Sequence, residues 1–196
     1  MKRTFAILFA AALGFMAATS CIEDEYDLDK EIDKTIELKN FSVALNRTFT
    51  FAVQDILPSE YKNYSGDFVA TLPDGVLGSF KVDGIYDELD DDYLFKQAIV
   101  TATIENGLPK PFTATAVALS KNGAVLDNIT ATLKSGPVPT GTSTITVEVK
   151  ANSNMHFDAV KLELKMDETQ VQFNSAQKVV VKDIVINFPN GIAKKD

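Results

Sequence analysis

The sequence has 196 residues, of which 45% are hydrophobic and 23% charged, and its 19 basic and 27 acidic side chains give a formal net charge of −8. This apolar fraction can build a hydrophobic core, and it excludes disordered, collagen-like and multi-pass membrane proteins. The acidic balance argues against nucleic-acid binding, which needs a basic face for the phosphates. One cysteine and one histidine exclude a disulfide framework and a cysteine-based zinc finger.

The N-terminal residues have the composition of a secretory signal peptide. Basic Lys2 and Arg3 precede an almost wholly apolar run, Phe5 to Ala18, and small residues follow it as far as Ser20. The apolar run is shorter than the roughly 20 residues that a transmembrane helix needs. We therefore expect residues 1–20 to be a signal peptide that is removed from the mature chain.

The residues around the single cysteine resemble a known processing signal. Ala18-Thr19-Ser20-Cys21 resembles a bacterial lipobox, in which the cysteine thiol is acylated and the cysteine becomes the mature N-terminus. The usual pattern prefers Leu at the position of Ala18. The alternative is ordinary cleavage after Ser20, which would leave Cys21 as an unpaired thiol in an oxidising compartment. The resemblance implies that lipid on Cys21 holds the protein on a membrane.

A strongly acidic segment follows the cysteine. Residues 21–37 hold eight acidic and two basic side chains, and we expect 21–34 to be a solvated tether. The cluster Glu23-Asp24-Glu25 is similar to the surface-export signal of Bacteroidetes lipoproteins, and residues 26–28 and 32–36 resemble the opening of uncharacterised lipoproteins from that group. These resemblances imply an outer-membrane lipoprotein that is exposed at the cell surface.

From residue 35 to residue 190 the sequence consists of short runs rich in Val, Ile, Thr and Phe, separated by Gly, Pro and Asn. Apolar and polar residues alternate most clearly in 48–54, 143–150 and 160–166, which is typical of antiparallel strands with one face in solvent. The other predicted strands are 36–45, 67–72, 76–82, 94–105, 112–120, 124–133 and 178–188. Many short strands with frequent turns predict an all-β fold, an antiparallel immunoglobulin-like β-sandwich, over 35–190.

Three details refine this prediction. Asn122-Gly123 predicts a two-residue hairpin between 112–120 and 124–133. The run 178–188 is apolar on both faces, so we expect it to lie in the interior of a sheet. The acidic stretch 87–92 interrupts the strand pattern, and we expect one continuous domain, with a subdivision near this stretch as the alternative.

Two groups of residues are candidates for ligand binding. The first is a weak calcium site, for which a solvated loop tip is the simpler interpretation; its carboxylates are Asp87, Glu88, Asp90, Asp91 and Asp92. The second is a glycan-contacting surface made by tyrosines in loop-like segments; they are Tyr61, Tyr64, Tyr86 and Tyr93. We expect no other cofactor.

The sequence contains no nucleophile elbow, P-loop or dinucleotide-binding fingerprint, so we expect a non-enzymatic binding or structural role. One alternative is a glycan-binding accessory lipoprotein of a nutrient-uptake system. Another is a fimbrillin-like pilus subunit, which requires proteolytic removal of an N-terminal segment near Arg47 and polymerisation by donated strands. A hydrolase ranks last, because a dyad would need His156 to meet Ser143, Ser153 or Ser175.

Overall fold

The computed structural model describes residues 41–84, 93–120, 122–155 and 157–194. The chain divides into two units between Lys34 and Thr35, and all described residues belong to the second unit. Within them, no helix is long and apolar enough to cross a membrane. The signal peptide and the acidic tether lie outside these residues and stay predictions.

The described elements are almost all strands, joined by three single turns of helix. The strands are β1 (Phe41–Leu45), β2 (Phe49–Ala52), β3 (Asp67–Thr71), β4 (Val76–Val82), β5 (Tyr93–Asn106), β6 (Thr113–Leu119), β7 (Ile129–Leu133), β8 (Gly141–Met155), β9 (Ala159–Lys165), β10 (Gln170–Asn174), β11 (Lys178–Phe188) and β12 (Ala193–Lys194). The helical turns are α2 (Val53–Ile56), η1 (Ser59–Tyr61) and η2 (Pro73–Gly75).

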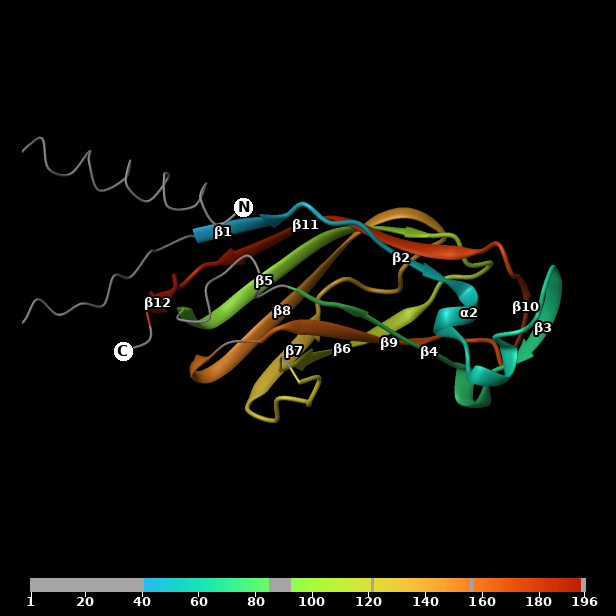
Figure 1. The fold of residues 1–196 in the computed structure, drawn as a ribbon, viewed down its shortest axis with the longest axis horizontal. Helices are drawn as coiled ribbons and strands as arrows, with labels where there is room; N and C mark the ends of the chain where they lie inside the picture. The colour runs from blue at the N-terminus through green and yellow to red at the C-terminus, as the bar shows by residue number, and fades with distance from the viewer. Residues whose placement is uncertain (1–40, 85–92, 121, 156, 195–196) are drawn as a thin grey trace, which may run out of the picture. The chain divides into compact units, whose positions relative to one another are not determined.

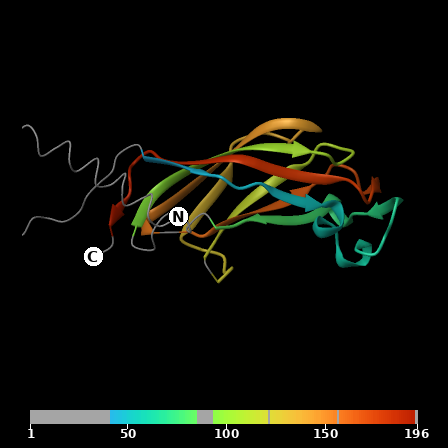
Figure 2. The same ribbon diagram turned by 45° about the horizontal axis from the view of Figure 1, so that its top comes forward.

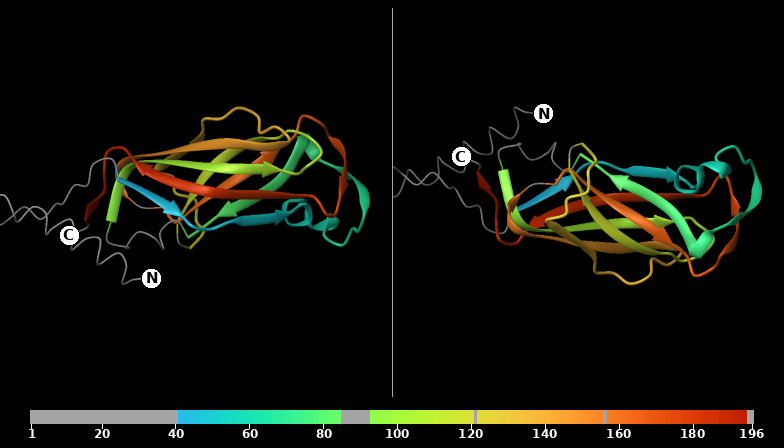
Figure 3. Two further views of the ribbon diagram at one scale, coloured as in Figure 1. Left: turned by 90° about the horizontal axis from the view of Figure 1, so that it is seen from above. Right: turned by 90° about the horizontal axis from the view of Figure 1, so that it is seen from below.

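The strands form antiparallel sheets that pack together as a sandwich (Figure 1). The larger sheet has the order β1-β11-β5-β8-β7, with β2 also paired to β11 and β12 to β5. The smaller sheet has the order β4-β9-β6, and Figure 3 shows the two layers from opposite sides. A separate pair, β10-β3, lies at one end. The predicted all-β, antiparallel class is therefore confirmed.

The alternation in the sequence places apolar side chains between the two sheets. In β8, Ile145, Val147 and Val149 are buried, and in β9 Leu162 and Leu164 are buried while Glu163 and Lys165 are exposed. Side chains of successive strand residues point to opposite faces, so this pattern buries one face of each strand. The burial of these side chains is the main contribution to the stability of the sandwich.

The interior position predicted for 178–188 is confirmed. β11 pairs with β5 on one side and with β1 and β2 on the other. Val179, Val180 and Val181 are all buried, as a strand covered on both faces requires. A bulge interrupts the β11–β5 register between Lys182 and Val185, and Asp183 within it has a φ of 52°.

The predicted hairpin at Asn122-Gly123 forms only over a few residues: Leu119 and Val125 make an isolated antiparallel bridge, and the N–H of Leu126 donates to the Ala118 carbonyl (3.2 Å). The N–H of Ser120 donates to the carbonyl of Ala124 (2.9 Å), but β6 pairs with β9 and β7 pairs with β8. Beyond this short hairpin the chain passes from one sheet to the other, so the prediction that 112–120 and 124–133 pair along their length was wrong. An Asn-Gly turn fixes only a few residues, whereas the sheet in which a strand pairs depends on where its apolar face is buried.

Two other segments differ from the predicted strands. The strand predicted over 48–54 ends at Ala52, because α2 begins at Val53. β10 was not predicted at all. Its apolar residues are only Val171 and Phe173, and its exposed positions carry amides, which have low strand propensity.

One end of the sandwich is built from segments outside the two main sheets. We call it the β3–β10 end; it comprises α2, η1, β3, η2 and β10 (Figure 2). β11 begins near this end at Lys178, opposite Ala52, and finishes at Phe188, opposite Phe41. The first described residue of β1 and the β3–β10 end therefore lie at opposite ends of β11.

Candidate functional site

Most of the sequence-predicted site residues lie outside the described residues. This holds for Cys21 and the export cluster Glu23, Asp24 and Glu25; for the calcium candidates Asp87, Glu88, Asp90, Asp91 and Asp92; and for Tyr86 and His156. The backbone of Tyr93 begins β5, but its side chain is not described. These assignments stay predictions.

The structure brings the two remaining tyrosines together but gives them different environments. Their ring centroids are 5.6 Å apart, and both rings contact Phe68. Tyr61 is only 8% exposed, whereas Tyr64 is 48% exposed. Of this pair, Tyr64 alone offers a ring to a ligand. The expectation that Tyr61 would contribute to a surface does not fit its burial.

The hydroxyl of Tyr61 binds the backbone of β3 in the β3–β10 end. Its hydroxyl accepts a hydrogen bond from the N–H of Thr71 (2.9 Å) and donates one to the carbonyl of the same residue (3.3 Å). Both backbone groups of Thr71 point away from β10, so the hydroxyl takes the place that a neighbouring strand would occupy. Tyr61 thus closes one part of the outer edge of β3.

Hydrogen bonds hold β3 and β10 together at the end of the pair where β3 begins. The N–H of Gly66 donates to the Ser175 hydroxyl (2.9 Å), and the N–H of Ser175 donates back to the Gly66 carbonyl (2.9 Å). The Asn174 amide donates to the Asp67 carboxylate (2.6 Å). The rings of Phe68 and Phe173 lie 6.0 Å apart across the pair. These contacts hold β3 in place although it pairs with one strand.

A second polar group lies on the outer face of the larger sheet. The Glu148 carboxylate on β8 accepts ion pairs from Lys134 (2.8 Å) and Lys150 (2.9 Å) and a hydrogen bond from Gln97 (2.7 Å). The hydrogen bonds from Lys134 and then Lys150 lower the pKa of Glu148 from 4.5 to about 2, against the opposing effect of desolvation. The Asn190 amide donates to Gln97 (3.0 Å), so the group links β5, β8 and the C-terminal turn.

Further along β5, Glu105 pairs with Lys182 on β11. The hydrogen bond to the Glu105 carboxylate raises the pKa of the lysine above its usual value. Both polar groups are satisfied within the protein: the charges of Lys182 and Glu105 cancel, while Lys134 and Lys150 against Glu148 leave one positive charge. We interpret them as cross-strand contacts that fix the register of the larger sheet.

The serines considered for a dyad have other environments. The Ser175 hydroxyl is engaged by Gly66, and Ser143 lies opposite Ile104 with a buried hydroxyl that has no hydrogen-bond partner in the described structure. Within residues 41–84, 93–120, 122–155 and 157–194, no three His, Cys, Asp or Glu side chains come close enough to hold a metal ion.

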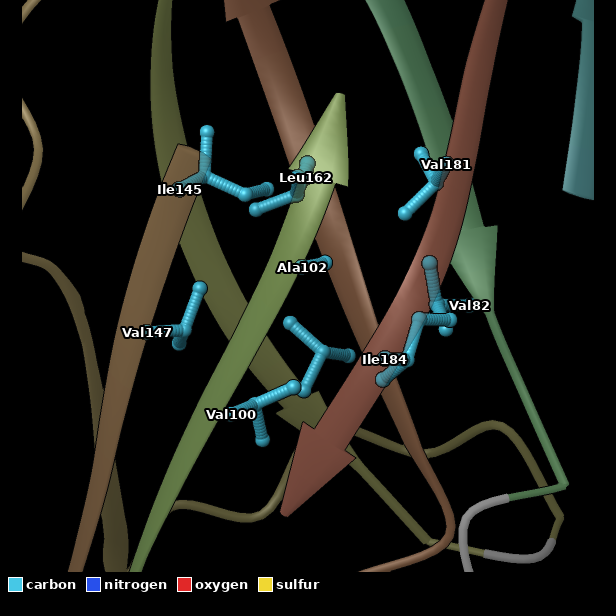
Figure 4. Close-up of a pocket in the computed structure, with 9 residues that line it drawn as sticks. Val82, Val100, Ala102, Ile145, Val147, Leu162, Val181 and Ile184 are labelled. Atoms are coloured by element: carbon cyan, nitrogen blue, oxygen red, sulfur yellow. The ribbon is translucent and has the colours of Figure 1, made fainter. Parts of the chain in front are cut away.

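A cavity of about 20 Å³ lies between the two sheets. Figure 4 shows its lining, in which side chains of β5, β8 and β11 face those of β4 and β9. The lining is wholly apolar: Val82, Val100, Ala102, Ile145, Val147, Val160, Leu162, Val181 and Ile184. Ligand sites are far larger and contain polar groups that orient the ligand, so this cavity is a gap in the core packing.

Comparisons with known proteins assign no family. No protein-family model matches the sequence, and no curated protein matches it. Among solved structures, a mutant VP2 protein of infectious bursal disease virus in T=1 particles is 13% identical, with a TM-score of 0.18, over 88% of this chain and 45% of that one. The VP2 subviral particle of the same virus gives 13% identity and a TM-score of 0.16, over 88% of this chain and 46% of that one.

The chain thus spans less than half the length of these capsid proteins. Scores this low assign neither fold nor function.

Proposed function

We propose that this protein is a lipid-anchored outer-membrane protein, exposed at the cell surface, with a non-enzymatic binding or structural role. The observation that carries the proposal is the sequence Ala18-Thr19-Ser20-Cys21 followed at once by Glu23-Asp24-Glu25. The first motif resembles a lipobox and the second a surface-export signal. Several acyl chains on Cys21 would hold the protein firmly on a membrane, because each buried CH₂ contributes about 0.8 kcal/mol.

The course of the chain supports a role at the β3–β10 end. Phe41, the first described residue after the tether, lies at the far end of β11 from that end. At about 3.3 Å per residue, β11 extends over roughly 35 Å. A sandwich anchored through its N-terminus would thus carry α2, η1, β3 and β10 away from the point where the chain enters it.

We also propose that the sandwich is of the immunoglobulin-like type. The support is the pairing of five consecutive strands: β8 lies between β5 and β7 in one sheet, while β6 pairs with β9 in the other. Strands B to F of immunoglobulin domains pair in the same way. The flanking strands differ, because β11 lies beside β5, where strand A would be, and β4 lies beside β9, where strand G would be.

Replacing the cysteine tests the anchor. We expect the full-length chain to remain with the outer-membrane fraction of its host, and Cys21→Ala to be lost from that fraction.

Alanines at Glu23, Asp24 and Glu25 test export, and Glu60→Ala, which removes an exposed carboxylate from the folded domain, is the control. We expect the triple variant to keep its lipid but resist protease added to intact cells. Unchanged surface proteolysis would place the export signal elsewhere.

A pilus subunit is the second candidate, and the position of β1 favours it. Arg47 is exposed in the link directly after β1, so cleavage there would remove a strand that pairs with β11 from Phe41 to Leu45. Val43 and Leu45, both buried, would leave the core with it. A strand donated by another copy could fill that position. Polymers whose subunits begin after Arg47 would support this role, whereas monomers that retain the lipidated N-terminus would contradict it.

A further inference from the structure

The outer edge of β3 has backbone groups that no described strand pairs. Across β3 and β10, Leu72 donates to the Thr169 carbonyl (2.7 Å) and Ser175 donates to the Gly66 carbonyl (2.9 Å). Hydrogen-bonded and non-hydrogen-bonded pairs alternate along an antiparallel ladder. Phe68 and Ala70 therefore bond to β10, while the N–H and C=O groups of Asp67, Val69 and Thr71 point to the other edge.

Only part of this edge is closed by the protein itself. The Tyr61 hydroxyl occupies the backbone groups of Thr71, but within the described residues β3 has no partner strand beyond β10. Figure 1 shows β3 as the outermost strand of the β3–β10 end. Asp67 and Val69 thus each present one N–H and one C=O to whatever approaches that edge.

Two exposed apolar side chains flank this edge. Val69 is 59% exposed and Tyr64 is 48% exposed, and both belong to the small set of large hydrophobic residues that are exposed in the described structure. The Tyr64 ring lies 5.2 Å from the ring of Phe68, so it borders the face of β3 opposite to the Val69 side chain. A strand added to this edge would place one residue beside Val69 and its neighbours beside Tyr64.

The charge of the surrounding surface indicates which strand would fit. Residues 53–76 carry four exposed acids and one exposed lysine: Asp55, Glu60, Asp67 and Asp74 against Lys62. A basic side chain next to Tyr64 could also contact the face of its ring. A second copy of this acidic chain would bring like charges together and fits less well.

We propose that the free edge of β3 at Asp67 and Val69 is a strand-addition site for an extended, basic segment of a partner protein. Main-chain hydrogen bonds would provide the affinity, and Val69, Tyr64 and Asp67 would select alternating apolar and basic side chains. This inference rests on the proposed binding role and names its site, but it does not depend on the lipid anchor. Its failure would leave the test at Cys21 unaffected.

The test measures binding of defined peptides to the full-length chain. The probe is a short peptide that alternates valine and lysine; its controls are a peptide that alternates valine and glutamate and a backbone N-methylated form of the probe. At a probe concentration ten times Kd, we expect hydrogen exchange of the Val69 amide to slow by about elevenfold. Equal binding of the N-methylated peptide would overturn strand addition, and equal binding of the glutamate peptide would overturn the preference for basic partners.

Two proline variants locate the site. Proline is tolerated at edge positions whose N–H is not used in a ladder, so Val69→Pro should keep the fold while it removes a donor. We expect it to weaken probe binding by at least about tenfold, or 1.4 kcal/mol. Val125→Pro is the control, since Val125 is also exposed (56%) but lies in the short hairpin after β6, opposite Leu119, and this variant should bind the probe normally.

The peptide controls apply to the unmodified chain, so the test remains decisive if Val69→Pro fails to fold. Unchanged exchange at Val69 with saturating probe would overturn the proposal. A dimer that forms without peptide and is lost in Val69→Pro would overturn the proposed partner and assign the edge to a second copy.

Discussion

The hydroxyl of Tyr61 makes a structural contribution that its ring alone would not make. By bonding to both backbone groups of Thr71, it satisfies the end of a strand edge that would otherwise depend on water. The buried ring of Tyr61 also packs against the exposed ring of Tyr64, with 5.6 Å between their centroids. At the scale of single residues, a side chain that no ligand can reach thus supports the surface that a ligand would contact.

We expect Tyr61→Phe to lower the free energy of unfolding by about 1–2 kcal/mol, because the ring stays packed while the backbone groups of Thr71 lose their partner. Urea denaturation followed by circular dichroism measures this loss. Tyr64→Phe is the matched control, since that side chain is 48% exposed, and it should stay within about 0.5 kcal/mol of the unmodified protein. Equal effects of the two changes would contradict the role given to the Tyr61 hydroxyl.

Glu148 should make stability depend on pH in acid. Its pKa is about 2 in the folded protein against 4.5 as the ordinary value, so the folded state binds fewer protons in this range than the unfolded state. The stabilisation is fully present above about pH 4.5 and is lost as the pH falls towards 2. We therefore expect Glu148→Gln to melt at a lower temperature than the unmodified protein at pH 6, with the gap closing between pH 4.5 and pH 2.

Melting curves at several pH values check this expectation. Glu163→Gln on β9 serves as the control, because its carboxylate is half exposed and pairs with one lysine, Lys161. Its gap should be smaller at pH 6. A gap for Glu148→Gln that stays constant down to pH 2 would show that the two lysines do not hold the carboxylate as described.

At the scale of elements, the packing of α2 against β4 depends on a glycine. Gly78 has a φ of +137°, and a Cβ built there would lie 1.8 Å from the carbonyl oxygen of Ile56, the last residue of α2. This oxygen belongs to the backbone and cannot rotate away. The close approach brings the start of the β3–β10 end against the smaller sheet.

We expect Gly78→Ala to destabilise the protein by about 3 kcal/mol or more, through both backbone strain and the clash. Gly123→Ala is the control: it has a φ of +77° but no atom within 4 Å of the added Cβ, so only the conformational cost of about 1 kcal/mol should appear. Equilibrium denaturation of both variants gives the difference. Similar losses for the two would mean that α2 does not approach β4 so closely.

The strands differ in how well the sequence predicts them. Alternation predicts β8 and β9, because one face of each is buried, and the apolar run at 178–188 predicts β11, where Val179, Val180 and Val181 are all buried. The pattern fails at β10, where the strand is short and its exposed side is formed by amides. At Asn122-Gly123 the predicted hairpin is limited to a short pairing, since local turn chemistry does not determine which sheet receives the next strand.

The free edge of β3 is harder to predict from the sequence, because it depends on contacts between residues that are far apart in the chain. The free edge at Val69 exists because β3 pairs with β10, a contact between residues about a hundred positions apart, and because Tyr61 covers only Thr71. The sequence identifies the tyrosines as candidates but does not indicate that Tyr61 is buried and Tyr64 exposed. Exposed backbone groups leave no signal in amino-acid composition.

For the molecule as a whole, the distribution of the acidic residues and the position of the single cysteine both bear on the proposed location at a membrane surface. Eight of the 27 acidic side chains lie within residues 21–37, directly after Cys21, so the acidity is concentrated beside the proposed anchor. A run of like charges favours a solvated spacer, so we propose that this segment separates a membrane from the folded domain. The sandwich that follows supplies a stable support whose β3–β10 end lies at the opposite end of β11 from Phe41.

We propose that the sandwich is displayed from a lipid on Cys21, and the mass of the N-terminal peptide provides the test. The peptide is to be isolated from the native outer membrane by digestion of the full protein and examined by mass spectrometry. We predict a mature chain that begins at Cys21 and carries the mass of a diacylglyceryl group on the thiol. A chain that begins at the same residue with a free thiol would contradict the account.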